Sequence, residues 1–354
     1  MRRWNGWGDE AIEYPAPAGA VALLNRLLGP GTPPRDASLE QVLTTIPPSR
    51  LPRHPLISAA PFDRLQHARG QSLPDWIALR SGRLDAFPDG VAFPTCEDDI
   101  RQLLGYAASV EAQVIPYGGG TSVVGHINPL PGERPVLTID MGRLNRLLHC
   151  DIQSGLATFE AGVAGPDLEA QLRARGLTLG HYPQSFEYST LGGWIATRSS
   201  GQQSLGYGRI ERLFAGGRLV APAGELVLPP FPASAAGPDL RELVLGSEGR
   251  LGVLTEATVR ASRMPECEAF HAVFLPSWEQ AQTAVREIVQ ARLPLSLLRL
   301  STPAETVTTL ALAGHKRLIG ALERLLTLRG IAEGKCMLLI GLSGREALVK
   351  TARR

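Results

Sequence analysis

Apolar residues recur along the chain with two periods, and each period predicts its own kind of element. Helical spacing between Cys96 and Val110 predicts a helix, and Thr95 with Asp98 resembles a capping box at its start. Pro166 opens a second helix that ends at Gly176. Short apolar runs between these helices have the length of strands: Gln113 to Tyr117, Val136 to Asp140, Arg146 to Asp151 and Ala157 to Ala161.

The two ends of the chain differ in character. From Met1 to about Pro88 the chain is rich in Pro, Gly and Arg, with a helical patch at Ala20 to Leu28, and predicts an irregular or helical arm. From about Pro265 to Arg354 strand and helix patterns alternate, which suggests a separate domain. Its expected strands are Glu268 to Phe274, Leu295 to Leu300 and Cys336 to Leu342, and its expected helices are Trp278 to Ala291 and Ala321 to Leu328. Strands mixed with crossover helices indicate an α/β or α+β fold.

Composition narrows the class of protein. The 354 residues are 44% hydrophobic, enough for about two domains with sizeable cores. Lys and Arg (36) nearly balance Asp and Glu (34), so the chain has little net positive charge. Nonspecific electrostatic binding to nucleic acid or to an anionic membrane is therefore not expected. The cysteines, at 96, 150, 267 and 336, lack CxxC spacing, which disfavours a zinc site or a disulfide framework. We find no transmembrane run and no signal peptide, and expect a cytoplasmic protein.

The segment YGGGTSVVGH, from Tyr117 to His126, is the first candidate for chemistry. Its glycines permit positive φ, and successive N–H groups in such a turn form an anion-binding concavity. A P-loop is excluded because Thr121 and Ser122 follow Gly120 without a lysine. A dinucleotide fingerprint is excluded because residues 128–132, NPLPG, leave no room for a helix. On this segment alone, a glycine-rich hairpin without a ligand is equally consistent.

Two further glycine clusters follow, from Ser189 to Gly208 and from Gly246 to Gly252. Three separated clusters are more than turns usually require. An extended ligand that touches the backbone at several places would explain them, because glycine permits close approach where a Cβ would collide.

Several of these segments resemble the FAD-binding domain of the PCMH-type, vanillyl-alcohol-oxidase-like flavoproteins, and within them the alkyldihydroxyacetonephosphate synthase family. The N-terminal RRWNGWG, Arg2 to Gly8, resembles that family's tryptophan motif, and the matching motifs occur in the family's order over nearly the whole chain. The matching segments are PYGGGTSVVG (Pro116 to Gly125), HYPQSFEYSTLGGWIATRSSG (His181 to Gly201), YGRIERL (Tyr207 to Leu213), GPDLRELVLGSEG (Gly237 to Gly249) and GSEGRLGVLTEATV (Gly246 to Val259).

The resemblance implies an α+β fold and a non-covalent FAD. A two-subdomain FAD-binding domain would span residues 80–264, between an N-terminal arm (1–79) and a partial cap domain of antiparallel sheet with helices (265–354). Covalent attachment at His126 is not expected, because Thr121 and Ser122 stand where the family's linking histidine usually sits. The implied diphosphate residues are Pro116, Tyr117, Gly118, Gly119, Gly120, Thr121, Ser122 and Val123. The implied ring and ribityl residues are Gln184, Ser185, Ser189, Thr190, Gly193, Thr197, Arg198, Ser199 and Ser200. On the adenosine side the implied residues are Glu248, Gly249, Leu251, Gly252, Val253 and Leu254.

Arg299 is the expected catalytic residue. It stands alone in the apolar stretch Ser296 to Thr302, where an unpaired buried guanidinium would be expensive, so an anionic partner is expected. The resemblance implies contact with a substrate phosphate or carboxylate, although Thr302 and Pro303 replace the family's carboxylate and amide; a buried salt bridge is the alternative. His181 and Arg198 are open between flavin-facing and structural roles, and Trp4, Trp7 and Trp194 are expected to be core or packing residues.

The implied activity replaces the acyl group of an acyl-dihydroxyacetone phosphate with a long-chain alcohol, through a flavin adduct. The alternatives are an FAD-dependent 2-hydroxyacid (D-lactate-type) dehydrogenase and an inactive flavin-binding remnant. Family members continue beyond residue 354 with a catalytic tyrosine and a histidine-rich segment, so we expect a fragment, a split gene product or a degenerate copy with exposed apolar surface. The expected partner is a small molecule, a phosphorylated ketone ester or a 2-hydroxyacid, and not nucleic acid; a homodimer and peripheral membrane contact stay open.

Overall fold

A computed structural model describes residues 2–232 and 235–353, which form two compact units. The first unit comprises Met1–Glu10, Arg35–Gln202 and Tyr207–Met264. The second comprises Ala11–Pro34, Gln203–Gly206 and Pro265–Arg354. The first residue of the expected arm and the last residue of the expected cap, residues 1 and 354, lie outside the described residues.

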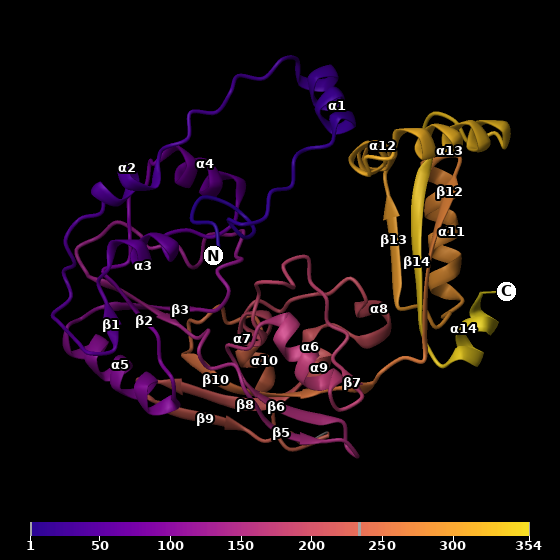
Figure 1. Cartoon of the computed structure of the whole chain (residues 1–354). Helices are drawn as coiled ribbons and strands as arrows, with labels where there is room; N and C mark the ends of the chain where they lie inside the picture. The colour runs from indigo at the N-terminus through magenta and orange to yellow at the C-terminus, as the bar shows by residue number, and fades with distance from the viewer. Residues whose placement is uncertain (1, 233–234, 354) are drawn as a thin grey trace. The chain divides into compact units, whose positions relative to one another are not determined.

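The first unit contains a small four-stranded sheet in the order β1-β2-β4-β3 (Figure 1). Strands β2 and β3 run parallel to β4, and β1 is antiparallel to β2. Helix α5 connects β2 to β3 and buries Ile100, Leu103 and Leu104 against the sheet. The bounds are β1 Ile57–Ser58, β2 Gly90–Ala92, β3 Gln113–Tyr117, β4 Val136–Asp140 and α5 Glu97–Ser109.

The start of α5 differs from the expected capping box. Thr95 donates from its backbone N and its hydroxyl to Asp99, at 2.8 and 2.9 Å, and not to Asp98. The carboxylate of Asp98 instead accepts from Arg101, one turn further along the helix. An acidic residue at the helix start still favours the positive end of the helix dipole, so the helix forms where expected.

A five-stranded antiparallel sheet in the order β5-β6-β10-β8-β9 forms the rest of the first unit. Helices α6, α7, α9 and α10 cover one of its faces, with Leu168, Leu191 and Ile210 packed against Phe159 and Ala257 of the sheet (Figure 1). The strands are β5 Leu147–Asp151, β6 Leu156–Glu160, β8 Phe214–Ala221, β9 Gly224–Leu228 and β10 Val253–Arg260. The helices are α6 Gly165–Arg173, α7 Leu191–Ala196, α9 Ile210–Leu213 and α10 Arg241–Val244, and β7 Leu177–Thr178 pairs with β11 Ser262–Arg263. The short helix α8, Ser204–Tyr207, belongs to the second unit except for its last residue.

The N-terminal region contains more helix than its Pro-rich pattern indicates. Helices α2 (Leu39–Thr44), α3 (Pro61–Gln66) and α4 (Leu73–Ser81) belong to the first unit. They share a small core built from Val42, Leu65, Ala68, Leu79 and Phe87. Each helix is short, so no long period is visible in the sequence. Capping boxes at Ser38 and Ser72 start two of them.

The second unit is built on the three-stranded antiparallel sheet β12-β14-β13, which confirms the expected antiparallel sheet with helices. Helix α11 packs against all three strands, and α1 lies beside α12. The bounds are β12 Cys267–Leu275, β13 Leu297–Ser301, β14 Cys336–Gly344, α1 Ala18–Leu28, α11 Trp278–Gln290, α12 Pro303–Leu312, α13 Lys316–Leu328 and α14 Glu346–Ala352.

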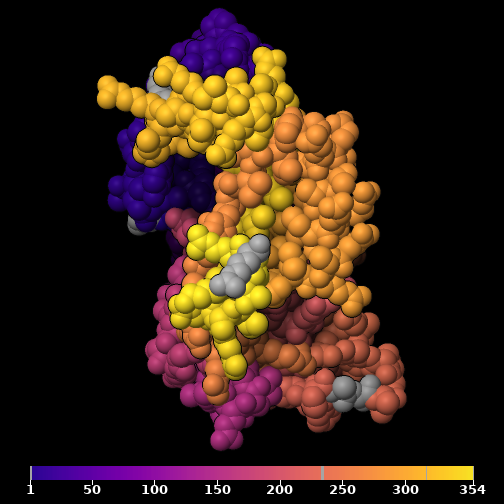
Figure 2. Space-filling view, turned by 90° about the vertical axis from the view of Figure 1, so that its right-hand side faces the viewer, coloured from indigo at the N-terminus to yellow at the C-terminus, as the bar shows by residue number. Residues whose placement is uncertain are grey.

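Apolar side chains are left exposed on two helices of this unit. Leu318 and Leu328 on α13 are 70% and 86% exposed, and Leu312 on α12 is 54% exposed. Figure 2 shows the side of the molecule on which the orange and yellow residues of this unit lie at the surface. Among the described residues no helix combines the length and the apolar character needed to cross a membrane.

Candidate functional site

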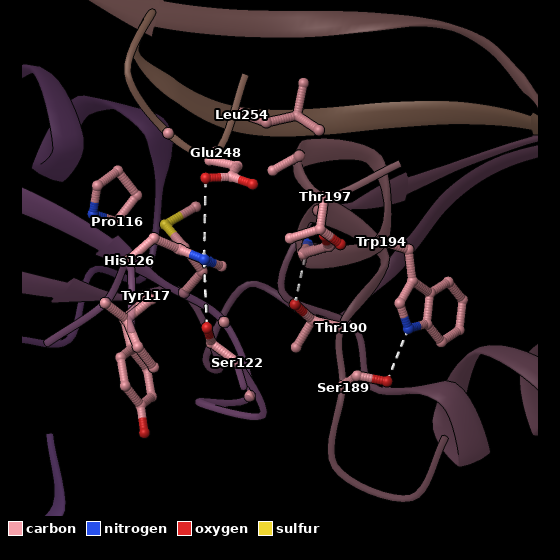
Figure 3. A pocket seen from close by; sticks show the side chains of 18 of the residues that line it. Pro116, Tyr117, Ser122, His126, Ser189, Thr190, Trp194, Thr197, Glu248 and Leu254 are labelled. Atoms are coloured by element: carbon pink, nitrogen blue, oxygen red, sulfur yellow. Dashed lines mark hydrogen bonds and ion pairs between the residues drawn. The ribbon is translucent and has the colours of Figure 1, made fainter. Parts of the chain in front are cut away.

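A cavity of about 360 Å³ lies within the first unit, between three loops and the strands that carry them. The first segment runs from the end of β3 through the loop after it, between residues 116 and 127. The second surrounds α7 at residues 185–199, and the third runs from the end of α10 to the start of β10, residues 244–254. Figure 3 shows side chains from all three loops around this space. The three glycine clusters of the sequence therefore meet at one place.

The glycine loop presents main-chain donors at this cavity. All six residues from Gly118 to Val123 line it. Across residues 2–232 and 235–353, none of their backbone N–H groups donates a hydrogen bond to another atom. Backbone N–H groups that are shielded from bulk water need a partner, and a row of them in a turn favours an anion.

The loop is also packed tightly against the second loop. A Cβ atom on Gly119 would lie 1.7 Å from the carbonyl oxygen of Tyr188, and one on Gly118 would lie 2.3 Å from Oγ1 of Thr190. Gly120 has φ +63°, in the left-handed region that favours glycine. The glycines are thus required by the contact between two loops, as well as by any ligand.

Hydroxyl groups fix the second loop. Thr190 caps α7, and its Oγ1 accepts from the N–H of Gly193 at 3.3 Å. Ser189 accepts from Nε1 of the buried Trp194 at 2.7 Å and donates to the carbonyl oxygen of Ser185 at 2.9 Å (Figure 3). The Ser189 hydroxyl therefore already uses its proton inside the protein.

His126 joins the first loop to the third. Its Nδ1 lies 3.2 Å from the hydroxyl oxygen of Ser122 and 4.0 Å from a carboxylate oxygen of Glu248 (Figure 3). Glu248 has φ +51°, which a non-glycine residue adopts only when its surroundings hold it there. The place of His126 in the cavity wall was not predicted from the sequence.

His181 lies behind the second loop. It is fully buried, and burial lowers its pKa from 6.5 to about 4. Its Nε2 lies 3.1 Å from Oγ of Ser199, a cavity residue, and its ring meets Trp194 edge-on at 4.9 Å. His181 does not line the cavity itself, so its contacts are those of a neutral residue that supports the wall.

The structure gathers most of the expected cofactor residues around this cavity. Gln184, Arg198, Ser200 and Leu251 lie outside the lining, and Arg198, with φ +55°, pairs with Glu242. The expected residues that line the cavity are Pro116, Tyr117, Gly118, Gly119, Gly120, Thr121, Ser122, Val123, Ser185, Ser189, Thr190, Gly193, Thr197, Ser199, Glu248, Gly249, Gly252, Val253 and Leu254.

Other lining residues were not expected from the sequence. Most are apolar or small, and in a sequence such residues look like ordinary core positions. Only His126 carried a visible signal, a polar ring four residues after Ser122. The unexpected lining residues are Val124, His126, Ile127, Met141, Ala161, Gly192, Trp194, Ala196, Leu219, Val244 and Ser247.

Arg299 lies in the second unit, on β13, and is exposed. The expectation of a buried guanidinium is wrong, because β13 is an edge strand and its apolar neighbours do not cover this side chain. Its charge acts weakly on Glu305, whose pKa is lowered mainly by the N–H and hydroxyl of Thr302. That carboxylate caps α12, at 2.8 Å from the N of Thr302.

Comparisons with known proteins agree with this architecture. The family described as "FAD binding domain" matches residues 88–228, and the one described as "FAD linked oxidases, C-terminal domain" matches residues 264–354. The alkyldihydroxyacetonephosphate synthase of Dictyostelium discoideum is 33% identical over 345 residues, which cover 87% of this chain and 56% of that protein. A solved structure of alkyldihydroxyacetonephosphate synthase matches 99% of this chain and 71% of its own chain, with 28% identity and a TM-score of 0.88.

A second kind of relative is more distant. The mitochondrial D-lactate dehydrogenase (cytochrome) of Arabidopsis thaliana is 30% identical over 216 residues, which cover 60% of this chain and 37% of that protein. The chain thus spans about half the length of these curated relatives, or less.

Proposed function

This chain belongs to the FAD-linked oxidases, and from that premise we propose that the cavity of the first unit holds its FAD without a covalent bond. The observation that carries the proposal is the row of N–H groups from Gly118 to Val123, which line the cavity without a partner among the described residues. A diphosphate is an anion of the size and charge that such a row binds. A volume of about 360 Å³ falls within the usual range of ligand pockets, about 300–1,000 Å³.

In this proposal each of the three loops binds a different part of the cofactor. Residues 118–122 bind the diphosphate, residues 185–199 line the flavin ring and ribityl chain, and residues 248–254 close over the adenosine side. A bound flavin supplies the redox and nucleophilic chemistry of its ring, and the protein supplies orientation and local charge. The carboxylate of Glu248, 4.0 Å from Nδ1 of His126, lies where the first and third loops meet.

We propose that the reaction is the exchange of the acyl group of an acyl-dihydroxyacetone phosphate for a long-chain alcohol. Support comes from the 33% identity to a synthase and from the structural match over 99% of this chain. In this proposal Arg299 binds the substrate phosphate, a role that suits an exposed guanidinium without a carboxylate within ion-pair distance among the described residues.

The test has two separate stages. Titration of the apoprotein with FAD should quench flavin fluorescence at a ratio of one FAD per chain. The loaded protein should then convert palmitoyl-dihydroxyacetone phosphate and hexadecanol to hexadecyl-dihydroxyacetone phosphate and palmitate, measured by mass spectrometry. Failure to bind FAD would contradict the proposed site. Binding without product would leave the site standing and identify the chain as a flavin-binding remnant under these conditions.

A 2-hydroxyacid dehydrogenase is the second candidate, because a D-lactate dehydrogenase is among the relatives. Anaerobic addition of D-lactate would then bleach the flavin absorbance, and the synthase substrates would not. In either assay Arg299→Ala should raise KM strongly, whereas Arg286→Ala, a change at an exposed arginine of α11, should not. Equal effects of the two substitutions would contradict the role proposed for Arg299.

The proposed function also bears on the substrate, the compartment and the partners of the protein. Family members act on small molecules, and we propose a phosphorylated ketone ester as the substrate, with a 2-hydroxyacid as the alternative. The four cysteines are free thiols, which supports a reducing compartment such as the cytoplasm. Size-exclusion chromatography with light scattering would test for a homodimer, and flotation with phosphatidylcholine vesicles would test for peripheral membrane contact.

A further inference from the structure

The N-terminal segment RRWNGWG has no role in the site as described so far. In the structure residues 2–9 form a small closed loop of the first unit. Arg2 and Asp9 pair as an antiparallel bridge, and the N–H of Arg3 donates to the carbonyl oxygen of Gly8 at 2.9 Å. The side chain of Arg3 donates to the carbonyl oxygen of Asp9 at 3.2 Å, which closes the loop further.

This N-terminal loop holds the two segments that pack against each other behind the cavity. The guanidinium of Arg2 donates to the carbonyl oxygen of Gly119 and lies over the ring of Tyr188, 5.4 Å from its centre. Trp7 meets the same ring edge-on at 5.1 Å. Gly119 and Tyr188 are also the pair whose contact leaves no room for a Cβ atom. Arg2 and Trp7 therefore contact both segments of this pair, Arg2 at Gly119 and Tyr188 and Trp7 at Tyr188.

The bond from Arg2 has a consequence for the next N–H group. In a trans peptide the C=O and the N–H point in opposite directions, so a donor on the oxygen of Gly119 fixes the direction of the Gly120 N–H. Gly120 lines the cavity, and its N–H donates to none of the described residues. A charged donor on the carbonyl also polarises the peptide group, which makes its N–H a stronger donor.

Among the residues that the structure describes, no carboxylate lies within ion-pair distance of Arg2. A second cavity of about 150 Å³ lies behind the glycine loop, with Arg2, His67, Arg69 and Asp140 among its lining residues. Asp140 is hydrogen-bonded to Nε2 of His67 at 2.8 Å and to the N–H of Gly142 at 2.7 Å. Arg69 pairs with Asp85. Arg2 thus brings a positive charge to a loop whose sequence contains no lysine.

We propose that Arg2 is a positioning residue for the diphosphate of the cofactor: it orients and polarises the Gly119–Gly120 peptide so that the Gly120 N–H donates to a phosphate oxygen. The inference rests on the proposed FAD site. It assigns the N-terminal motif to cofactor retention, and it predicts that only ligands with a diphosphate depend on Arg2.

The experiment compares Arg2→Met, Arg2→Lys and the control Arg83→Met, which removes the same charge from an exposed site of the first unit. Each apoprotein is titrated with FAD, with ADP and with riboflavin. Arg2→Met should weaken binding of FAD and of ADP by about tenfold or more, as for loss of a charge-assisted bond, and should leave riboflavin binding unchanged. Arg2→Lys should restore part of the affinity, and Arg83→Met should match the wild type.

The outcomes separate the inference from the function on which it rests. If the wild-type apoprotein binds no FAD, the proposed site fails. If the wild type binds FAD and Arg2→Met binds FAD and ADP equally well, the site stands and the role of Arg2 is overturned. A fall in the melting temperature of apo Arg2→Met with equal losses for FAD, ADP and riboflavin would show a structural role only, and would also overturn the inference.

Discussion

The Nε2 atom of His181 lies 3.1 Å from Oγ of Ser199, whereas its Nδ1 has no hydrogen-bond partner in the described part of the chain. An unpaired N–H inside a protein costs more than an unpaired lone pair, so the proton of the neutral ring belongs on Nε2. The ring then donates to Ser199. The hydroxyl proton of Ser199 stays free to donate into the cavity that this residue lines.

The lowered pKa of His181 predicts how stability changes with pH. The unfolded chain binds a proton at this side chain below its ordinary pKa of 6.5, but the folded protein does so only below about 4. Stability is therefore complete above pH 6.5 and falls as the pH decreases through the window from 6.5 to 4. Between pH 7 and pH 5 this one residue should remove about 2 kcal/mol of unfolding free energy.

Urea unfolding of the wild type and of His181→Gln at pH 7 and pH 5 measures this contribution. The variant should lose about 2 kcal/mol less than the wild type over this interval, because it has no ring to protonate. His149→Gln, a change at an exposed histidine of β5, should behave like the wild type. Identical pH dependence of wild type and His181→Gln would contradict the buried, neutral ring.

Gly119 is expected to tolerate no side chain, even in the absence of ligand. A Cβ atom there would lie 1.7 Å from the carbonyl oxygen of Tyr188, so Gly119→Ala must push two loops apart. Overpacking of this kind typically costs about 1–3 kcal/mol. The apoprotein should therefore melt at a lower temperature in calorimetry and retain less FAD. Gly132→Ala, where a Cβ would meet no atom within 4 Å, serves as the control and should melt like the wild type.

The pattern of apolar residues predicted the regular parts of the fold well. The strands at Gln113–Tyr117 and Val136–Asp140 have the expected bounds, because each is a short apolar run bounded by turn residues. Strand β8, Phe214–Ala221, was not expected, since two glycines and Arg218 interrupt its apolar residues. β8 lies between β10 and β9 in the sheet. Hydrogen bonding to a strand on each side stabilises β8, although its own residues favour a strand only weakly.

The site was predictable only where it depends on the main chain. Glycine clusters reveal where backbone approaches a ligand or another loop, and all three clusters reach the cavity. Two wall residues, Met141 directly after β4 and Leu219 within β8, are apolar and look like core positions in any sequence. The bond from Arg2 to Gly119 joins residues 117 positions apart, and no local pattern carries that information.

The buried carboxylate of Asp89 is expected to contribute strongly to the stability of the first unit. It is 3% exposed and accepts from Nη2 of Arg50 at 2.7 Å and from the N–H of Val136 at 2.8 Å. Burial alone would raise its pKa, but the bonds from Arg50 and Val136 outweigh it and lower the pKa. Its stabilisation is therefore present above the ordinary pKa of 3.8 and is lost as the pH falls through the lowered value.

Asp89→Asn should reduce the unfolding free energy at pH 7 by about 2 kcal/mol, since it weakens bonds that a charged acceptor makes in a buried place. Asp36→Asn, which breaks the exposed pair with Arg80, should cost less than about 1 kcal/mol. Urea unfolding of both variants measures the difference. A loss at Asp89 no larger than that at Asp36 would show that the buried carboxylate contributes little.

Ser189 offers a test of which hydroxyls serve the cofactor and which serve the fold. Its proton goes to the carbonyl oxygen of Ser185 and its oxygen accepts from Nε1 of Trp194, which is 2% exposed. Ser189→Ala would leave that indole N–H buried and unpaired, at a cost of about 1–3 kcal/mol in unfolding free energy. Because the hydroxyl has no proton left to donate to a ligand, the Kd for FAD should change by less than about twofold in the folded variant, well below one hydrogen bond. Calorimetry and FAD titration of the same sample check both values, and an unchanged stability with a tenfold weaker Kd would mean that the hydroxyl faces the flavin instead.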